Sequence, residues 1–143
     1  MELTFHSEGI DFELEDSTII QTWLKQVIKN ENWILANVAY IFCSDAYLYK
    51  MNVEHLQHDT YTDVITFQYN EDFVEGDVFI SVERTAENAG IFGVTPNREL
   101  HRVMVHGLLH LMGYKDKEPK DKALMTEKEN QYLELLDTIL VSN

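Results

Sequence analysis

Residues 106–116, with the sequence HGLLHLMGYKD, combine side chains that could bind a metal ion. His106 and His110 are four residues apart, so a helix would place both imidazoles on one face. Gly113 is the residue type that ends a helix in the left-handed region, and the chain could then fold back and bring Asp116 to the same point. Two imidazoles and one carboxylate, with coordination positions left open, are typical of a catalytic metal site.

The histidine pair alone is a weak signal, because the chain contains six histidines. Its helical context, the glycine that follows and the carboxylate beyond make it more specific. We expect surface or ordinary core positions for the others, which are His6, His55, His58 and His101. Zinc proteases of the H-E-x-x-H type use a glutamate after the first histidine as general base, and Gly107 stands there instead. A hydrolase in which the ion itself activates water or polarises a phosphoryl oxygen does not need that glutamate.

Four basic residues flank the histidines. Arg98 and Arg102 continue the histidine stripe at four-residue steps toward the start of the helix. Arg102 could therefore contact a bound phosphate one turn from the first histidine, but the simpler interpretation is that both arginines face water. Lys115 and Lys117 are open to the same two interpretations.

The rest of the chain predicts the elements that must position these side chains. We expect strands over residues 2–6, 34–43, 62–67 and 76–80, with the last two joined as a hairpin through 69–72. We expect helices over 17–30, 45–57, 82–88, 96–112 and 120–140. The expected N-caps are Asp16 or Ser17, Ser44 or Asp45, Ser81, and Thr95 ahead of Pro96. This order predicts an α+β fold: one domain over 1–143, a small mixed β-sheet with helices packed over it, and the metal site on a helix and the turn that follows.

The helix that carries the histidines should also bury one face in the core. The residues expected on that face are Leu100, Val103, Met104, Leu108 and Leu111. Gly107 lies among them and costs roughly 1 kcal/mol of helix propensity relative to alanine. We therefore expect another backbone to approach the helix closely at this glycine.

The composition of the chain limits the classes of function that it could have. A formal charge of −14 argues against generic nucleic-acid binding, so a nucleic-acid substrate would need a local basic or metal-centred site, or delivery by a partner. An apolar content of 45% is enough for a buried core, and no apolar run approaches a membrane span. Residues 1–8 lack the features of a secretory signal, and Cys43 is most simply a buried small hydrophobe. We expect a cytoplasmic protein that does not contact the membrane.

Three sequence blocks resemble the YbeY family of bacterial rRNA-maturation endoribonucleases. H-G-L-L-H-L-M-G-Y over residues 106–114 is similar to the family pattern H-G-x-L-H-L-x-G-Y-D-H. Met51-Asn52, with T-D-V-I-T-F over 62–67, resembles L-N-x-x-Y-R…T-D-V-L-S-F, and G-D-V-F-I-S over 76–81 resembles G-D-I-x-I-S. In order and spacing these blocks cover roughly residues 45–130.

The resemblance implies that His106 and His110 are zinc ligands and that Asp116 replaces a third family histidine. A carboxylate is a harder, anionic ligand, so another divalent metal could be accepted and bound water should be less acidic than with three imidazoles. Leu56 falls where the family has an arginine, and Lys115 where it has an aspartate. Leu56 cannot bind phosphate, which leaves Arg102, Lys115 or Lys117 as substitutes.

Three further positions are ambiguous from sequence. Asp63 could cap a turn, orient a ligand histidine through its second nitrogen, or assist proton transfer, and we rank capping first. With Arg102 it is a weak catalytic candidate. Met125 and Glu129 match weakly placed family positions on the last helix, where core packing and surface exposure are sufficient explanations.

The function implied by the resemblance is that of a zinc-dependent, single-strand-specific endoribonuclease. It would act in 3′ end maturation of small-subunit rRNA and in ribosome quality control, as a monomer with one zinc ion, with rRNA, the small subunit and its assembly factors as partners. Whether metal-bound water or the RNA 2′-hydroxyl attacks, and which group is the general base, stay open. Two alternatives remain: a metal-dependent hydrolase of peptides or small molecules, and a non-catalytic ribosome assembly factor. The acidity of the chain and the missing arginine favour the second of these.

Overall fold

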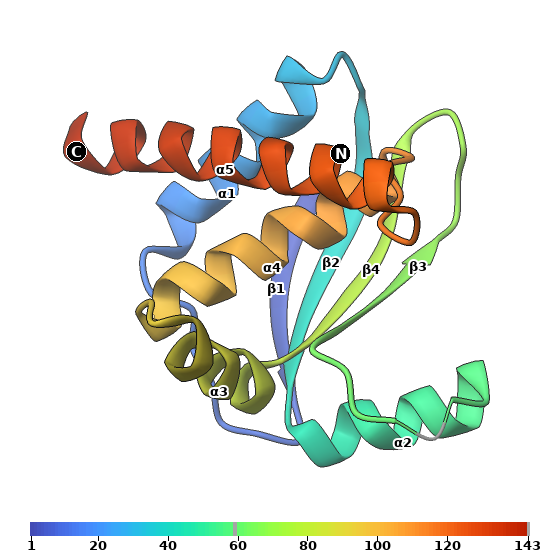
Figure 1. Ribbon diagram of the computed structural model, residues 1–143. Coiled ribbons are helices and arrows are strands. Elements are labelled where there is room, and N and C mark those ends of the chain that lie inside the picture. Colours follow the sequence, from blue (N-terminus) through green and yellow to red (C-terminus); the bar gives the residue numbers. More distant parts are fainter. Residues whose placement is uncertain (59, 143) are drawn as a thin grey trace.

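A computed structural model describes residues 1–58 and 60–142, which form a four-stranded sheet covered by helices (Figure 1). Positions 59 and 143 of the expected 1–143 domain lie outside the described residues. The strands are β1 (Glu2–Glu8), β2 (Leu35–Cys43), β3 (Val64–Gln68) and β4 (Val74–Ser81). They lie in the order β1-β2-β4-β3, with β1, β2 and β4 parallel and β3 antiparallel to β4. The expected α+β fold with a mixed sheet is confirmed, including the hairpin.

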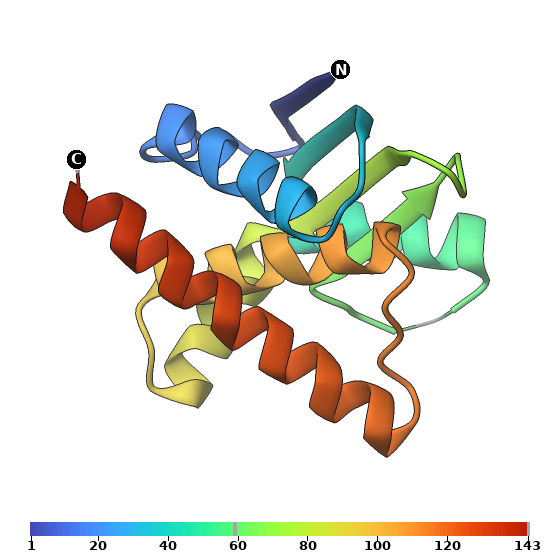
Figure 2. The same cartoon turned by 90° about the horizontal axis from the view of Figure 1, so that it is seen from above.

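The helices form layers over the sheet (Figure 2). They are α1 (Ser17–Asn30), α2 (Asp45–Leu56), α3 (Val82–Phe92), α4 (Pro96–Leu111) and α5 (Pro119–Ser142). Helices α1 and α4 pack their apolar side chains against one face of the sheet, and α5 crosses over both of them. Helix α2 lies on the other side, where Leu48 packs with Cys43 and Ile65 in a smaller cluster. Cys43 is buried, as expected. No helix within the described ranges is both long and apolar enough to cross a membrane.

Most of the expected helix starts are confirmed by side-chain caps. The hydroxyls of Ser44, Ser81 and Thr95 accept hydrogen bonds from backbone amides three residues ahead, at 3.0 to 3.1 Å. Pro96 then occupies the first turn of α4. Asp16 holds the N-cap position of α1, as expected, but it does so in a left-handed conformation with φ of 54°, and its side chain makes no capping hydrogen bond.

The element ends differ from the expectation by a few residues. Helix α3 does not end near Gly90 but continues to Phe92, and Gly93 takes the left-handed C-cap conformation with φ of 70°. Strand β3 begins at Val64 rather than residue 62, and β4 begins two residues earlier than expected. Helix α4 ends at Leu111, one residue before the expected end, and Gly113 follows with φ of 93°, the left-handed turn that its residue type predicted.

Helix α4 is the buried centre of the domain. The five side chains expected in the core are at most 4% exposed, and Val105 and Leu109 are buried as well because α4 lies between the sheet and α5. The Tyr40 hydroxyl donates to the Met104 carbonyl at 2.8 Å and so attaches β2 to the helix. The expected close backbone approach at Gly107 is wrong. A Cβ there would lie 2.7 Å from Cγ1 of Val78, so the glycine accommodates a side chain of β4.

Candidate metal centre

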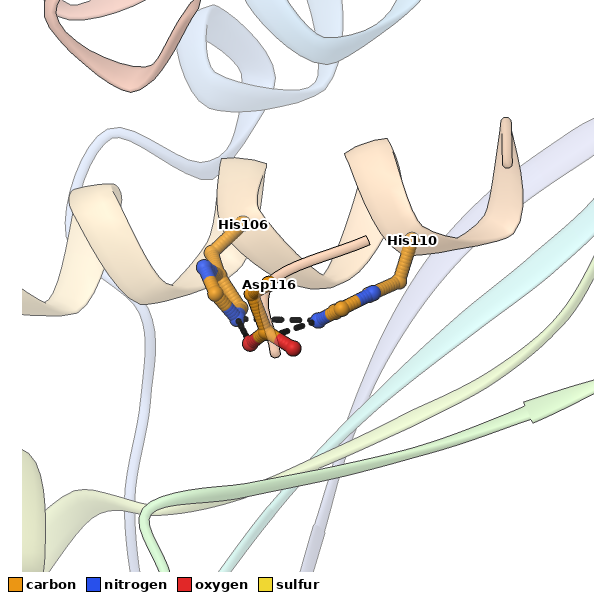
Figure 3. Close-up of side chains that lie close together, drawn as sticks. All are labelled: His106, His110 and Asp116. Carbon is orange, nitrogen blue, oxygen red and sulfur yellow. Dashed lines mark hydrogen bonds and ion pairs between the residues drawn. The ribbon is translucent and has the colours of Figure 1, made fainter. Parts of the chain in front are cut away.

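The three expected ligands converge on one point (Figure 3). Nε2 of His106 lies 3.1 Å from Nε2 of His110, and Oδ2 of Asp116 lies 3.2 Å from each of these nitrogens. Zinc bonds of about 2.0–2.1 Å to nitrogen and oxygen would place neighbouring corners of a tetrahedron about 3.3 Å apart. The donor spacing therefore fits three corners around one small divalent cation, with a fourth corner left for water or substrate.

Each histidine is oriented by a hydrogen bond at its other ring nitrogen. Nδ1 of His106 lies 2.6 Å from Oε2 of Glu129, and Nδ1 of His110 lies 2.9 Å from the carbonyl oxygen of Tyr114. A carbonyl oxygen and an ionised carboxylate can only accept, so both Nδ1 atoms carry the hydrogen. When both rings are neutral, their Nε2 lone pairs face the same point as the Asp116 carboxylate, which is the arrangement that metal-ligating histidines adopt. The residues present thus fit a divalent cation.

Local folding explains how the carboxylate reaches the histidines. After α4 the amides of Gly113 and Tyr114 donate to the carbonyls of His110 and Leu109, at 3.0 and 3.1 Å. These bonds, with the left-handed Gly113, end the helix and turn the chain back along it. Asp116 follows two residues later on the face that carries both imidazoles. We call residues 112–116 the ligand turn.

Glu129 is a site residue that the sequence analysis missed. Surface exposure or packing appeared sufficient for it, yet it lies on α5 with only 3% of the residue exposed and its carboxylate on His106. A signal was present in the sequence, because Glu129 falls at helical spacing within the apolar stripe of α5 that contains Met125, Tyr132, Leu133 and Leu136. An acidic residue in such a stripe needs a partner when buried.

Arg102 is the second partner of the Glu129 carboxylate, after His106. The expectation that Arg102 faces water is wrong. Its guanidinium donates to both oxygens of Glu99, at 2.8 and 2.5 Å, and to Oε1 of Glu129 at 2.9 Å. Both glutamates are almost fully buried. The hydrogen bonds that Arg102 donates to Glu99 are the main reason that the pKa of Arg102 is raised, and Glu129 adds to the effect. The donor groups of the Arg102 guanidinium are thus used by two carboxylates. Arg98, by contrast, forms a more exposed ion pair with Asp137.

The charges around His106 favour its protonated form in the absence of a metal. Burial alone would lower the pKa of His106, but the hydrogen bond and charge of Glu129, with Asp116 and Asp63 nearby, raise it above the ordinary value. Asp63 lies just before β3, and burial raises its pKa although His106 and its own backbone amide act in the opposite direction. The orienting role considered for Asp63 is filled by Glu129 at His106, and the capping role stays a prediction.

Two basic side chains line a pocket beside the cluster. A pocket of about 540 Å³ beside the cluster is lined by His110, Lys115, Asp116, Lys117, Glu118 and Asp121. Lys115 and Lys117 are exposed there. Leu56, at the position of the family arginine, is 39% exposed on α2.

Fold and site together define a class of protein: a small α+β domain with an open two-histidine, one-carboxylate centre at the end of a buried helix. The Endoribonuclease YbeY family matches residues 2–137. A relative of that name from Cytophaga hutchinsonii is 47% identical over 133 residues, covering 92% of this chain and 93% of the relative. Another from Flavobacterium psychrophilum is 47% identical over 134 residues, with 93% and 95% covered. The chain therefore belongs to the Endoribonuclease YbeY family, as its motifs predicted.

A solved structure agrees with this assignment. The solution structure of TM1509 from Thermotoga maritima is similar to the present fold with a TM-score of 0.72 and 29% sequence identity. The match covers 99% of this chain and 93% of the other. The mixed sheet and its helical layers are therefore shared over essentially the whole chain.

Proposed function

We propose that this protein is a zinc-dependent endoribonuclease that cuts single-stranded RNA. Family membership supports the reaction class, since the matched relatives carry the name Endoribonuclease YbeY. One structural observation carries the metal dependence: two Nε2 atoms and one carboxylate oxygen lie 3.1 to 3.2 Å apart, while both Nδ1 atoms are held by other protein groups.

Five groups would bind the ion or orient its ligands. A divalent ion bound by His106, His110 and Asp116 would polarise a phosphoryl oxygen and lower the pKa of a bound water. Glu129 and the Tyr114 carbonyl fix the two rings so that their free nitrogens point at one place. These residues therefore form the site before substrate binds, and little reorganisation is needed during the reaction.

Substrate contact is proposed for the exposed lysines of the adjoining pocket. Lys115 and Lys117 would attract an RNA phosphate toward the cluster, in the role that Leu56 cannot fill. Asp63, whose pKa burial raises, is the candidate for accepting or holding a proton near His106. Because the chain as a whole carries a charge of −14, we propose a local contact with a single strand rather than a broad duplex-binding surface.

The proposed cellular role is 3′ end maturation of small-subunit rRNA and ribosome quality control in the cytoplasm. In this role the protein acts as a monomer on rRNA, together with the small subunit and its assembly factors. Zinc is the proposed ion, and the hard carboxylate of Asp116 leaves room for other divalent metals. The resemblance of the three sequence blocks and the family match support this role.

A side-by-side assay tests the function. Purified protein is incubated with a single-stranded RNA, the same RNA in a duplex, and a peptide library, with and without chelator. We expect cleavage of the single strand only, its loss with chelator and its return when zinc is added. His106→Ala should abolish cleavage, whereas His6→Ala should not, because His6 is an exposed residue on β1, the edge strand opposite β3.

Three results would overturn the proposal. RNA cleavage that survives both chelation and His106→Ala would remove the metal centre from the reaction. Cleavage of peptides alone would indicate a peptidase. Cosedimentation with small subunits, combined with normal rRNA processing in cells that carry His106→Ala, would indicate a non-catalytic assembly factor. Elemental analysis of protein purified without added metal complements these assays, and Asp116→Ala should weaken binding about 10-fold or more.

A further inference from the structure

One carboxylate joins three separate segments of the chain next to the ligand turn. Glu31 lies at the C-terminal end of α1, and its side chain is only 9% exposed. It accepts a hydrogen bond from the Tyr114 hydroxyl at 2.5 Å and another from the Tyr132 hydroxyl. Lys128 adds a charged contact at 3.2 Å. Tyr114 belongs to the ligand turn, and the other two partners belong to α5.

The backbone of Tyr114 is also part of the candidate metal centre. Its carbonyl oxygen accepts the hydrogen bond from Nδ1 of His110 at 2.9 Å, and Asp116 follows two residues later. The position of this one residue therefore affects both the orientation of a ligand ring and the approach of the ligand carboxylate.

The ligand turn has few other side-chain supports. Gly113 is exposed, and a Cβ there would have no neighbour within 4 Å. Met112 begins the turn with its side chain in the core, and Lys115 is exposed, so beyond Gly113 it is the Tyr114 side chain that packs against the edge of the core. A glycine in the left-handed region leaves the backbone free to adopt other conformations unless a neighbour holds it.

We infer that Glu31 and Tyr114 form a clasp that holds the ligand turn in its metal-binding conformation, with Tyr114 as a positioning residue. The inference rests on the proposed metal site. Helix α1 carries none of the proposed ligands, yet through this clasp it controls where the Tyr114 carbonyl and Asp116 lie. The hydrogen bonds are charge-assisted and poorly exposed, which makes them stronger than ordinary surface contacts.

The structure offers a matched control in the second tyrosine. Tyr132 donates to the same carboxylate, but it lies on α5, and its carbonyl accepts from the Trp23 indole at 2.7 Å rather than from a ligand histidine. Removing either hydroxyl takes one hydrogen bond from Glu31. Only the removal at Tyr114 releases the ligand turn.

The test compares Tyr114→Phe with Tyr132→Phe in the full chain. Zinc affinity is measured by competition with a chromophoric chelator, and stability is measured by urea denaturation. We expect Tyr114→Phe to weaken zinc binding about 10-fold, as changes to groups that orient metal ligands do. Tyr132→Phe should lower stability without a comparable loss of affinity. Equal losses of affinity in the two variants, or no loss in Tyr114→Phe, would overturn the inference.

A second measurement separates this inference from the proposed function. Hydrogen exchange of the amides of residues 114–116 is followed in the metal-free protein. Faster exchange in Tyr114→Phe than in Tyr132→Phe supports the clasp even if the wild-type chain binds no zinc, in which case the proposed function alone fails. Unchanged exchange in Tyr114→Phe overturns the clasp, whatever the metal affinity of the wild type.

Discussion

Oε2 of Glu129 lies 2.6 Å from Nδ1 of His106, although the two residues are 23 positions apart and belong to different helices. The same carboxylate accepts from Arg102 through its other oxygen. Arg102 in turn binds Glu99, so a buried chain of alternating charges runs from the metal-ligand face of α4 to α5. The orientation of a candidate ligand thus depends on the packing of two helices.

Replacing Glu129 by glutamine should weaken metal binding while leaving the three ligands in place. Glutamine can still accept a hydrogen bond, but it lacks the negative charge that makes His106 a better donor of its lone pair to a cation. We expect the affinity for zinc to fall about 10- to 100-fold, measured by competition with a chelator. Glu127→Gln, on the exposed side of the same helix, is the control. Equal affinities in the two variants would contradict the orienting role of Glu129.

Replacing Arg102 by methionine should destabilise the fold strongly. The substitution removes the guanidinium from between Glu99 and Glu129, whose side chains are 1% and 4% exposed, so that Glu99 loses its cationic partner and Glu129 keeps only His106. Removal of one member of a buried ion pair costs roughly 3–5 kcal/mol. Urea denaturation at neutral pH measures the loss.

Arg98→Met provides the comparison for that experiment. Arg98 also pairs with an acidic residue of α5, but its side chain is 38% exposed and that of Asp137 is 54% exposed. Pairs of this kind contribute about 1 kcal/mol or less. A loss in Arg102→Met no larger than that in Arg98→Met would show that the buried network does not stabilise the protein.

The convergence of His106, His110 and Asp116 could be predicted from sequence because all three residues lie within 106–116. The spacing of His106 and His110 and the turn at Gly113 are local features, and local features determine the geometry of a helix and its C-cap. The helix starts at Ser44, Ser81 and Thr95 could be predicted for the same reason. The end of α3 could not be predicted, because two glycines lie near it and only the fold shows which of them ends the helix.

The partners that hold the cluster could not be predicted, because they come from distant parts of the chain. Glu31 reaches Tyr114 over 83 residues, and Glu129 reaches His106 over 23. The face of α4 that carries Arg102 looked solvent-exposed in the sequence, since nothing local shows that α5 covers it. The apolar stripe of α5 indicates that Glu129 is buried, but long-range packing decides which partner a buried charge meets, and no short window of a single sequence contains that information.

The pH dependence of stability should change when Glu31 becomes glutamine. Burial alone would raise the pKa of Glu31, but hydrogen bonds from Tyr114, Tyr132 and Lys128 outweigh it and lower the pKa below the ordinary value of 4.5. A lowered pKa in the folded state means that the ionised carboxylate stabilises the fold above pH 4.5 and that this contribution is lost as the pH falls through the folded-state pKa.

Urea denaturation of the wild type and Glu31→Gln from pH 7 down to pH 3 tests this sign. We expect the wild type to be more stable at pH 7 and the difference to shrink as the pH falls from 4.5 through the folded-state pKa, below which both chains carry a neutral side chain at this position. Glu8→Gln, an exposed position on β1, is the control and should give nearly parallel curves. A difference that is constant or grows toward acid would show that the clasp does not depend on charge.

Replacing Gly107 by alanine should destabilise the protein despite the better helix propensity of alanine. Alanine gains about 1 kcal/mol in an unconstrained helix, but here its Cβ would lie 2.7 Å from Cγ1 of the fully buried Val78. Removing that methyl group in the double variant Gly107→Ala with Val78→Ala should recover part of the stability, because the new Cβ then occupies the space that Val78 vacates. The coupling is measured by a double-mutant cycle in urea. Additive losses would show that Val78 is not the obstacle, and that the glycine is needed for another reason.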